Sequence, residues 1–430
     1  MERYERYKDS GVKWIGEIPG HWGMYKLKYL FKLNKNKNIG NKCNTILSLS
    51  YGKIKIKKDL NEGLTPESYE SYQLLSTGDI VIRSTDLQND HTSLRTGLVK
   101  IEGAITSAYI GLKNLDMSLC DSRFYHYFLH DWDITKAIYN QGKGLRQSLN
   151  WDDIKNMLIP VLDISEQTAI ANYLDSTTAK IDEAIAQQQK MIDLLNERKQ
   201  IIINNAVTKG LNPDVPMKDS GVDWIGEIPE HWEVNKLKNC AKTNSGSTPR
   251  NIAGKENPTS TIRWVRTTDL HNNVVEDTSE YISEKEMSSA SCPWLPVNTV
   301  LISMYGGAGS FGKVGLLNIE ATINQALCSI NCNSSILPKF MFYYLQSVHR
   351  IWMKYAASSR KDPNLNQEII RNLDLVIPPL VEQEQIVASI ESKLSSLETV
   401  VKCSEKQISL LQERKQIIIN DVVTGKVKVS

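Results

Sequence analysis

Two long stretches of the chain carry apolar residues at the spacing of an amphipathic helix. Over residues 166–208, apolar or small residues recur in alternating steps of four and three, and neither Gly nor Pro interrupts them. The same stripe returns 216 residues later, over 382–424. Its members are Ile170, Leu174, Thr177, Ile181, Ala184, Gln188, Met191, Leu195 and Ile202, and then Ile386, Ile390, Leu397, Val400, Ser404, Leu411 and Ile418. The spacing predicts two helices of about 43 residues that bury their stripes against each other, most simply as an antiparallel coiled coil.

The regions between these helices have a different pattern. They contain short runs of β-branched and alternating residues, separated by Gly and by Asn or Asp turns. The clearest runs are 79–83, 262–266, 299–303 and 313–317, and a helical pattern covers 339–352. Each region is therefore predicted to be a compact α+β domain.

An internal repeat frames both regions. Residues 8–22 return as 218–232 with 13 of 15 positions identical, and residues 194–204 return as 410–420 with one change. Residues 45–145 and 241–360 look largely unlike each other. The predicted fold has a pseudo-twofold repeat: two α+β domains separated by a pair of long antiparallel helices. The expected segments are a first domain (1–160), a first helix (161–212), a second domain (213–380) and a second helix (381–430).

Composition narrows the class of protein. The chain has 430 residues, of which 41% are hydrophobic and 23% are charged, as in ordinary globular proteins. No run approaches 18 apolar residues and the start has no apolar signal core, so we expect a cytoplasmic protein without a membrane span. The seven cysteines contain no CxxC pair, which argues against a disulfide framework or a zinc cluster. Cys328 and Cys332 are expected to be free thiols in a strand.

The net charge of +2 is unevenly distributed. Residues 1–160 carry 23 Lys and Arg against 18 Asp and Glu. The excess lies in Lys26, Lys28, Lys32, Lys35, Lys37, Lys42, Lys53, Lys55, Lys57 and Lys58, with Asn34, Asn36, Asn38, Asn41 and Asn44 among them. Such a stretch can follow DNA phosphates. It can equally be a solvated loop followed by an exposed strand face, and the sequence leaves both interpretations open.

The sequence offers no catalytic or metal-binding constellation. Residues 307–313 match the dinucleotide pattern G-x-G-x-x-G, but Val314 stands where a P-loop needs Ser or Thr. The segment also leads into a strand-like run and not into a helix N-terminus that could receive a phosphate. His21-Trp22 and His231-Trp232 occupy equivalent repeat positions, which indicates a structural clasp and not a reactive site. We therefore predict a chain that is not an enzyme on its own and holds no cofactor.

Candidate DNA-binding groups are easier to identify. Residues 142–150 place cations and an amide among glycines, and residues 358–366 are their basic counterpart in the second copy. Arg and Gln can form paired hydrogen bonds with guanine and adenine edges. The candidates are Arg83, Arg95, Lys143, Arg146, Gln147, Arg263, Arg266, Tyr305, Lys313, Arg360 and Lys361. For each, the alternative is a capped turn that holds the domain together. The matched segments 83–87 and 266–270, which share Thr-Asp-Leu, are expected to be framework.

These motifs together resemble the specificity subunits of Type I restriction-modification enzymes, over essentially the full length. The resemblance rests on the doubled Trp-Ile-Gly-Glu-Ile-Pro…His-Trp block (14–22, 224–232) and the doubled helix end (194–208, 410–424). The Ile-Pro-Pro-Leu…Glu-Gln helix start (377–383) and the segment from Tyr305 to Ala326 also carry it. In the first copy, Ile159-Pro160-Val161-Leu162 stands two residues further from Glu166-Gln167, so the resemblance does not specify how that helix begins.

The resemblance implies the mechanism. Two target recognition domains would each read one half of a split, asymmetric site in double-stranded DNA, with the paired helices as a ruler. Two methyltransferase subunits would bind S-adenosylmethionine and methylate adenine N6. Two motor-nuclease subunits, where present, would use ATP and Mg²⁺ to translocate and cleave. Two alternatives remain open: a methylation-only complex without a nuclease, and a coiled-coil scaffold for protein partners that does not read DNA.

Overall fold

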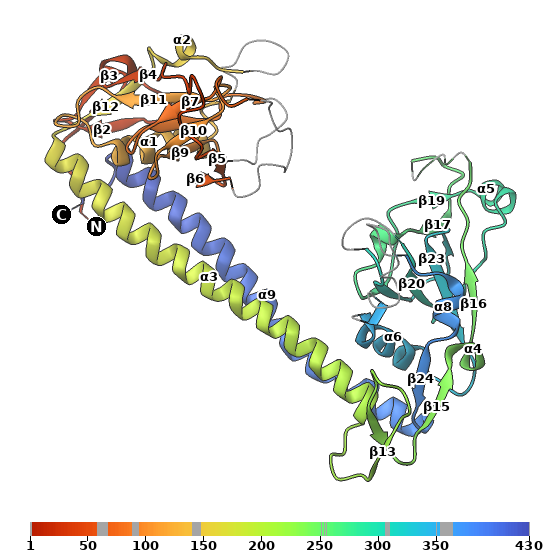
Figure 1. Cartoon of the computed structure of the whole chain (residues 1–430). Helices are drawn as coiled ribbons and strands as arrows, with labels where there is room; N and C mark the ends of the chain where they lie inside the picture. The colour runs from red at the N-terminus through yellow and green to blue at the C-terminus, as the bar shows by residue number, and fades with distance from the viewer. Residues whose placement is uncertain are drawn as a thin grey trace. The chain divides into compact units, whose positions relative to one another are not determined.

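The computed structural model describes residues 2–57, 68–87, 94–139, 148–250, 252, 254, 256–305, 310–349, 351–352 and 364–429. The chain forms two compact units (Figure 1). Unit 1 combines Met1–Gln189 with Glu405–Ser430, and unit 2 is Lys190–Ser404. The division falls within the long helices, so each unit contains one α+β head, the start of one long helix and the end of the other.

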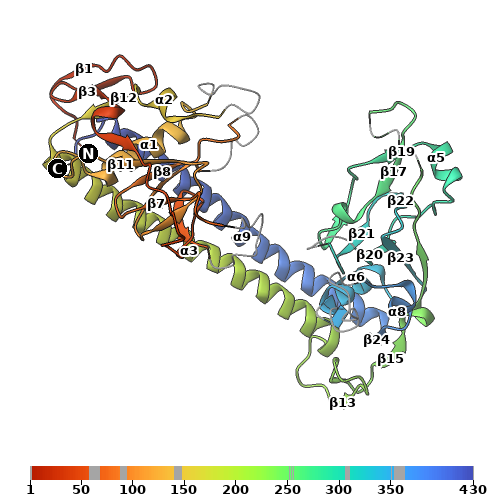
Figure 2. The ribbon, with the colours of Figure 1, turned by 45° about the horizontal axis from the view of Figure 1, so that its top comes forward.

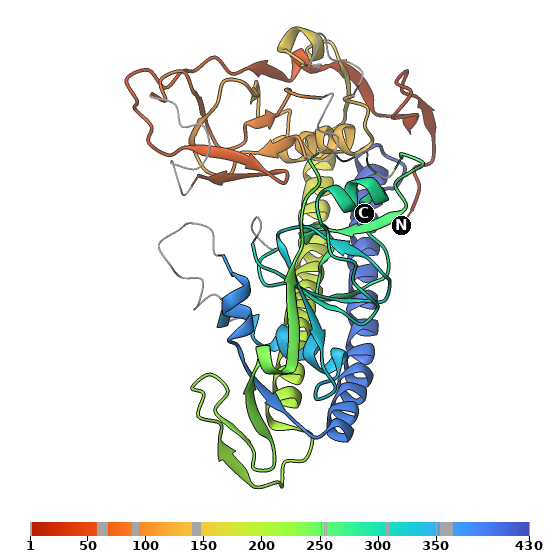
Figure 3. The ribbon, with the colours of Figure 1, turned by 90° about the vertical axis from the view of Figure 1, so that its right-hand side faces the viewer.

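The two predicted long helices are confirmed. Helix α3 covers Ile164–Lys209 and helix α9 covers Leu380–Val423. In unit 1 the start of α3 lies beside the end of α9, and in unit 2 the start of α9 lies beside the end of α3, so the pair is antiparallel (Figure 3). Lys415 Nζ lies 2.6 Å from Asp182 Oδ1 in unit 1, and Lys199 Nζ lies 3.0 Å from Glu398 Oε1 in unit 2. These two ion pairs are related by the 216-residue repeat.

The predicted apolar stripe is correct near the helix starts and wrong by one residue further along. Met191 is 48% exposed and Val400 is 45% exposed, whereas Ile192 is only 7% exposed. Near the end of α3, Ile203 is buried and Ile202 is half-buried. A straight α-helix has 3.6 residues per turn, so its buried face drifts away from a strict 3.5-residue repeat. A heptad continued from the helix starts therefore places Met191 and Val400 in the stripe, whereas the structure follows the helical period.

The first head is built on a four-stranded antiparallel sheet in the order β4-β11-β8-β9. Helix α1 packs against β9. The sheet strands and the helix are β4 (Phe31–Leu33), β8 (Ile80–Ile82), β9 (Thr96–Leu98), β11 (Ile110–Asn114) and α1 (Ser122–Ile134). The remaining pairs are β1 (Tyr7–Asp9) with β2 (Glu17–Pro19), β3 (Gly23–Lys26) with β12 (Leu158–Val161), β5 (Leu47–Ser50) with β6 (Lys53–Ile56), and β7 (Gln73–Leu75) with β10 (Gly103–Ile105). Two short helices, η1 (Leu27–Tyr29) and α2 (Trp151–Ile154), complete it.

The second head contains a five-stranded sheet in the order β16-β23-β20-β21-β18. Helix α6 lies against β20 and β21 (Figure 2). The elements are β16 (Ala241–Ser245), β18 (Asn273–Val275), β20 (Val300–Ser303), β21 (Val314–Leu317), β23 (Leu327–Cys332) and α6 (Pro338–Ser347). A second sheet joins β19 (Tyr281–Ile282), β17 (Ile262–Val265) and β22 (Thr322–Ile323), and two pairs join β13 (Met217–Asp219) with β14 (Glu227–Pro229) and β15 (Glu233–Lys236) with β24 (Asp374–Ile377). Short helices are α4 (Leu237–Cys240), η2 (Thr267–Asp269), α5 (Glu284–Ser289) and α8 (Gln367–Arg371).

The two heads share a core topology that their sequences hide. The order β4-β11-β8-β9 in the first head corresponds to β16-β23-β20-β21 in the second, and every neighbouring pair in both sets is antiparallel. Among the described residues the additions differ, because the second head has a fifth strand, β18, that pairs in parallel with β21. The β-runs expected from the sequence in these sheets are confirmed. Cys328 and Cys332 lie on β23, as expected.

Each head shares its hydrophobic core with the ends of both long helices. The main core of unit 1 includes Leu174 from α3 and Val422 from α9, together with Trp22 and Phe124 of the head. The main core of unit 2 is built in the same way from residues of its head, the end of α3 and the start of α9. Burial of apolar area at these contacts stabilises head and helices as one unit.

A clasp joins the repeated block to the first turn of each long helix. In unit 1, Glu166 accepts hydrogen bonds from Tyr4 Oη (2.7 Å), His21 Nε2 (2.9 Å) and Trp22 Nε1 (3.2 Å). In unit 2, Glu382 accepts from the equivalent residues His231 (2.8 Å) and Trp232 (3.0 Å). A carboxylate in the first turn also interacts favourably with the helix dipole. The prediction that the doubled His-Trp is a structural clasp is confirmed.

Both long helices begin in the same way. Gln167 is fully buried, and its amide nitrogen donates to the carbonyls of Leu119 (3.0 Å) and Leu162 (2.9 Å). Gln383 makes the equivalent bonds to Ser335 and Pro378. The apparent two-residue departure in the first copy therefore reflects only a different position of its proline, because the strands before both helices keep the 216-residue offset.

A glycine follows each long helix where the chain returns to the clasp. Gly425 has φ +74°, and a Cβ at this position would overlap Pro19 and approach Trp22. Gly210 has φ +76°, and a Cβ there would lie 3.2 Å from Trp232. Glycine is required at both positions by backbone conformation and by space.

Within the described residues, no helix is both long and apolar enough to cross a membrane. The same residues contain no cluster of three or more His, Cys, Asp or Glu side chains arranged to hold a metal ion.

Candidate nucleic-acid interface

The predicted DNA-binding residues fall into two groups in the structure. Six lie within the described part of the chain, and these are Arg83, Arg95, Arg263, Arg266, Tyr305 and Lys313. The other five lie outside the described residues, and these are Lys143, Arg146, Gln147, Arg360 and Lys361. Of the six that can be located, five are half-buried and one is fully buried.

Arg95 is the buried member, which does not fit its prediction as a DNA contact. It immediately precedes β9 and has no exposed surface. Its guanidinium donates to the carbonyls of Arg83 (3.2 Å), Thr85 (2.8 Å) and Asp86 (3.1 Å) and to the hydroxyl of Tyr139 (3.0 Å). Arginine has five N–H donors and no acceptor, so these contacts occupy most of its capacity. Arg95 holds the 83–87 segment in place, and this agrees with the interpretation of that segment as framework.

The lysines of the first head lie on different elements and have different surroundings. Lys53 and Lys55 project from the exposed face of the β5–β6 hairpin, while Ile54 between them packs on a small core beneath the hairpin. Lys53 Nζ lies 3.7 Å from Asp182 on α3. Lys37 instead donates to the carbonyl of Ser71 and to Ser107. The exposed strand face is therefore confirmed as a structural feature, and Lys58 lies outside the described residues.

Two of the interleaved asparagines are structural. Asn34 and Asn38 are buried. The Nδ2 of Asn34 donates to the carbonyl of Leu74, and Asn38 closes a turn by bonding to both backbone groups of Cys43. Asn side chains commonly stabilise turns in this way. These asparagines do not present their amides to DNA.

In the second head, two candidate arginines lie on or just after β17. Arg263 Nε lies 3.5 Å from Asp277, and Arg266 Nη2 lies 3.0 Å from Ser279 and 3.4 Å from Glu280. The two side chains remain 40% and 35% exposed, so each can still present N–H donors to the outside. Neighbouring carboxylates fix their orientation, which reduces the entropy lost when they bind a planar acceptor.

The segment after Arg266 is a capped turn, which the sequence offered as the alternative to DNA binding. Asp269 accepts from the backbone N–H of Arg266 (2.8 Å) and of Ser279 (3.1 Å). Leu270 and its counterpart Leu87 are fully buried. The Thr-Asp-Leu elements shared by both copies are therefore framework, anchored by their buried leucines.

Tyr305 and Lys313 flank the glycine-rich segment that resembles a P-loop. The hydroxyl of Tyr305 donates to the carbonyl of Gln325 (3.0 Å), which leaves the ring half-exposed. Lys313 is half-buried and directly precedes β21. The segment leads into a strand, as predicted from the sequence. A phosphate-binding loop of this kind is followed by a helix N-terminus, and the residues described after this segment form strand β21 instead.

Two histidines on α1 distinguish the first head. His126 and His130 stack with ring centroids 6.1 Å apart, on a cleft that Lys53, Lys100, Arg123, Asp175, Asp182 and Lys415 also line. Burial lowers the pKa of His126 to about 3, with His130 and Lys100 adding to the effect. Burial also lowers the pKa of His130 to about 4, with a contribution from Lys415. Phe342 and Gln346 occupy the corresponding positions of the second copy.

We expect the stability of unit 1 to fall as the pH falls below about 6.5, because both imidazoles take up protons in the unfolded chain but stay neutral in the folded one. The His126→Phe/His130→Gln variant carries the residues of the second copy and should lose much of this dependence. Buried Asp131, whose pKa is raised to about 6 by burial, acts in the opposite direction between pH 6 and 4. Denaturant unfolding followed from pH 7.5 to 4.5 measures the difference, and equal slopes for both proteins would contradict it.

An exposed apolar stripe near the end of each long helix was not identified as a surface from the sequence. We define the exit stripes as Leu194, Arg198 and Ile201 on α3, and Leu410, Arg414 and Ile417 on α9. The four apolar side chains are 51–54% exposed, although they are identical in the two copies. Residues at i, i+4 and i+7 share one face of a helix. The signal in the sequence was the retention of apolar residues outside the buried stripe in both copies.

The comparisons with known proteins agree with this architecture. The Type I restriction modification DNA specificity domain matches residues 229–407. A putative Type I restriction enzyme specificity subunit of Methanocaldococcus jannaschii, MjaX, is 24% identical over 98% of this chain and 98% of its own length. The EcoBI specificity subunit of Escherichia coli is 20% identical over 71% of this chain and 65% of its own length.

A solved structure supports the fold. One chain, from work on complex assembly and conformational transition of the Type I R-M system, matches with a TM-score of 0.69 at 15% identity, covering 95% of this chain and 99% of its own. The doubled clasp, the paired helices and the two heads of shared topology thus occur together with full-length sequence similarity. The chain belongs to the specificity subunits of Type I restriction-modification enzymes.

Proposed function

We propose that this chain is the non-catalytic subunit that reads a split, asymmetric site in double-stranded DNA, one half with each head. The observation that carries the proposal is the combination of a repeated framework with unlike surfaces. The clasp and the helix starts are the same in both units, and so is the order of the four core strands. The residues outside this framework differ, which is the arrangement expected when two domains of one plan recognise two different sequences.

In the proposed complex, basic side chains supply both phosphate and base contacts. Lys53 and Lys55 of the β5–β6 hairpin suit phosphate contacts, which position a protein on the duplex without reading its sequence. Arg263 and Arg266 are held by acidic neighbours with donors exposed, and this arrangement suits hydrogen bonding to a guanine edge. Lys143, Arg146, Gln147, Arg360 and Lys361 remain candidates from the sequence.

The proposed partners supply the chemistry. Two methyltransferase subunits would bind S-adenosylmethionine and methylate adenine N6, and motor-nuclease subunits would bind ATP and Mg²⁺. The exit stripes support a partner that binds in two copies, because the same exposed apolar residues occur once in each unit. The complex would act in the cytoplasm.

The paired helices would set the distance between the half-sites, with reading faces near one DNA turn of about 34 Å apart. We expect that four residues inserted after Gln188, matched by four after Ser404, lengthen the pair by about 6 Å. The tolerated spacer should then grow by one or two base pairs, and both half-sites should stay the same. Genome-wide mapping of methylated adenine, in cells with this chain and its partners, gives both half-sites and the spacer.

A change in the half-site bases with an unchanged spacer would contradict the ruler. The absence of any adenine methylation that depends on this chain would contradict DNA reading itself. A salt titration of DNA binding provides a second check, because phosphate contacts give a steep dependence of affinity on salt concentration, which a protein-only scaffold lacks.

A further inference from the structure

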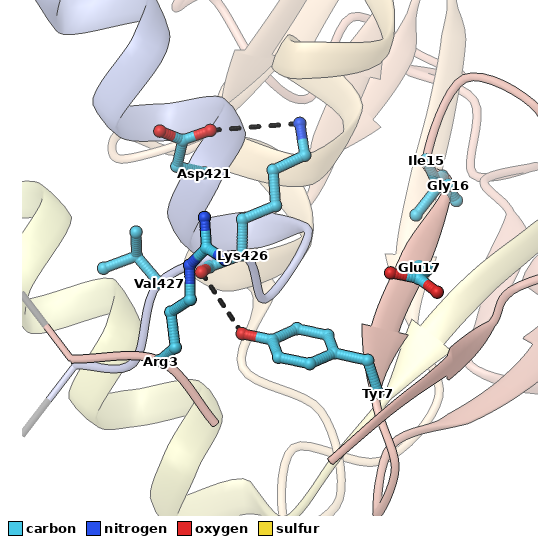
Figure 4. A pocket seen from close by; sticks show the side chains of 8 residues that line it. All are labelled: Arg3, Tyr7, Ile15, Gly16, Glu17, Asp421, Lys426 and Val427. Atoms are coloured by element: carbon cyan, nitrogen blue, oxygen red, sulfur yellow. Dashed lines mark hydrogen bonds and ion pairs between the residues drawn. The ribbon is translucent and has the colours of Figure 1, made fainter. Parts of the chain in front are cut away.

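Each unit contains a cleft between the repeated hairpin and the end of a long helix. In unit 1 the cleft has a volume of about 390 Å³ and lies between Ile15, Gly16 and Glu17 on one side and Asp421 and Lys426 on the other (Figure 4). In unit 2 the cleft has a volume of about 500 Å³ and lies between Ile225, Gly226 and Glu227 and the residues Asn205 and Lys209. The hairpin side is therefore the same Ile-Gly-Glu in both clefts.

Most identities in the repeated block have a structural reason. Ile18 and Trp22 are buried in the core, Asp9 accepts from the backbone N–H of Gly11 (2.9 Å), and His21 belongs to the clasp. Glu17 and its counterpart Glu227 have no such reason. Both are exposed, and neither side chain makes a hydrogen bond or an ion pair within the described residues.

The position of this glutamate carries an electrostatic cost that both copies retain. Glu17 on β2 stands directly opposite Asp9 on β1, and Glu227 stands directly opposite Asp219. Like charges in directly opposed positions of an antiparallel pair are destabilising. Neither basic residue that lines the first cleft pairs with Glu17. Lys426 donates to Asn420 (2.6 Å) and lies 3.9 Å from Asp421, and Arg3 makes no ion pair within the described residues. The glutamate costs stability and makes no side-chain contact within the chain. Its presence in both copies therefore indicates a positively charged group on a binding partner.

The exit stripes lead directly into the clefts. Asp421 lies four residues after Ile417, and Asn205 lies four residues after Ile201, so each continues the exposed helix face of its stripe. One side of the combined surface is apolar, and the other ends at an unpaired carboxylate. Two exposed positions of the hairpin differ between the copies, because Lys13 corresponds to Asp223 and Gly20 corresponds to Glu230. Identity at Glu17 and Glu227 is therefore informative.

We propose that the two clefts bind the same segment of a protein partner present in two copies, with an apolar part on the exit stripe and a lysine or arginine against Glu17 or Glu227. The partner is the methyltransferase subunit, and this assignment rests on the proposed function. The duplication of the cleft accounts for two copies, and the opposed carboxylates account for the basic group. The same carboxylates disfavour a DNA backbone as the occupant.

The test uses the full chain with the methyltransferase subunit in the variants Glu17→Lys, Glu227→Lys and the double variant. Titration and native mass spectrometry measure the affinity and the number of methyltransferase copies. Each single variant should bind one copy as wild type does and the second about tenfold or more weakly, and the double variant should bind both weakly. Glu230→Lys, an exposed change of the same charge three residues away, is the matched control and should bind two copies normally.

Glu17→Gln separates docking from folding. Because it removes the repulsion with Asp9, the free energy of unfolding should stay equal or rise while partner affinity falls. If affinity fell only in proportion to lost folded protein, or if Glu17→Lys and Glu227→Lys still bound two copies normally, the inference would be overturned and the proposed function would stand. If the variants strengthened DNA binding without changing methyltransferase binding, the assignment of the methyltransferase subunit as the partner in the clefts would be wrong. A wild-type chain that binds no methyltransferase would overturn the proposed assembly and this inference together.

Discussion

Replacement of Arg95 by methionine is expected to destabilise unit 1 by about 3–5 kcal/mol while leaving unit 2 unchanged. Methionine fills part of the volume of arginine but donates no hydrogen bonds. The carbonyls of Arg83, Thr85 and Asp86 would then be left without the donors they now have. An unsatisfied buried polar group costs about 1–3 kcal/mol, and the costs at one site do not add fully. Hydrogen exchange of the β8, β9 and α1 amides, followed in urea, measures the loss.

Arg266→Met is the matched control for this prediction. It removes an arginine of comparable sequence context whose side chain is 35% exposed and paired at the surface. Surface ion pairs contribute about 0–1 kcal/mol, so unit 2 should keep nearly all its stability. If Arg95→Met left unfolding unchanged but altered DNA recognition at one base pair, the burial of Arg95 would not describe its role in the complex.

Replacement of Trp22 by alanine should cost about 3–5 kcal/mol of stability in unit 1, the usual range for a buried aromatic residue. Trp22 has no exposed surface, donates to Glu166, and packs near Gly425 beyond the end of α9. The variant therefore removes a contact between the hairpin block, the start of α3 and the end of α9 at once. Protection of the amides at both helix ends within unit 1 should fall together in hydrogen exchange.

Trp232→Ala gives a matched result in the other unit. Trp232 is equally buried and donates to Glu382, so the loss should be of similar size but confined to unit 2. Trp22→Phe retains an aromatic ring but not the N–H donor and should cost less, about 1.5–3 kcal/mol for a hydrogen bond to a charged group. Loss of protection at only one of the two helix ends in Trp22→Ala would show that the clasp does not join them.

The long helices and the clasp could be predicted from the sequence because they are repeated. A period shared by residues 166–208 and 382–424 specifies two helices, whatever the local propensity of a single residue. The error at Met191 and Val400 arose where the heptad was extended too far along a straight helix. Polar residues of the stripe such as Gln188 do not reveal this error, because they are compatible with both the heptad repeat and the helical period.

The common sheet of the two heads could not be predicted from the sequence. Its strands are short, three to six residues, and their order depends on contacts between distant segments, such as β4 with β11. The burial of Arg95 was missed for a related reason. An arginine beside a turn looks the same in sequence whether its guanidinium faces solvent or three carbonyls of a neighbouring loop. Five of the candidate residues, among them Arg146 and Arg360, lie outside the described residues and stay predictions.

The sharing of helix ends between the heads has a consequence for biosynthesis. Unit 2 is one uninterrupted segment, Lys190–Ser404, whereas unit 1 needs residues on both sides of it. As the ribosome proceeds, Phe124 and Leu174 are made long before Val422, which completes the same core. Domains usually fold in N-terminal-first order during synthesis. Here the core of unit 1 is completed last, and the apolar surface that Val422 covers stays open until the final turns of α9 have left the ribosome.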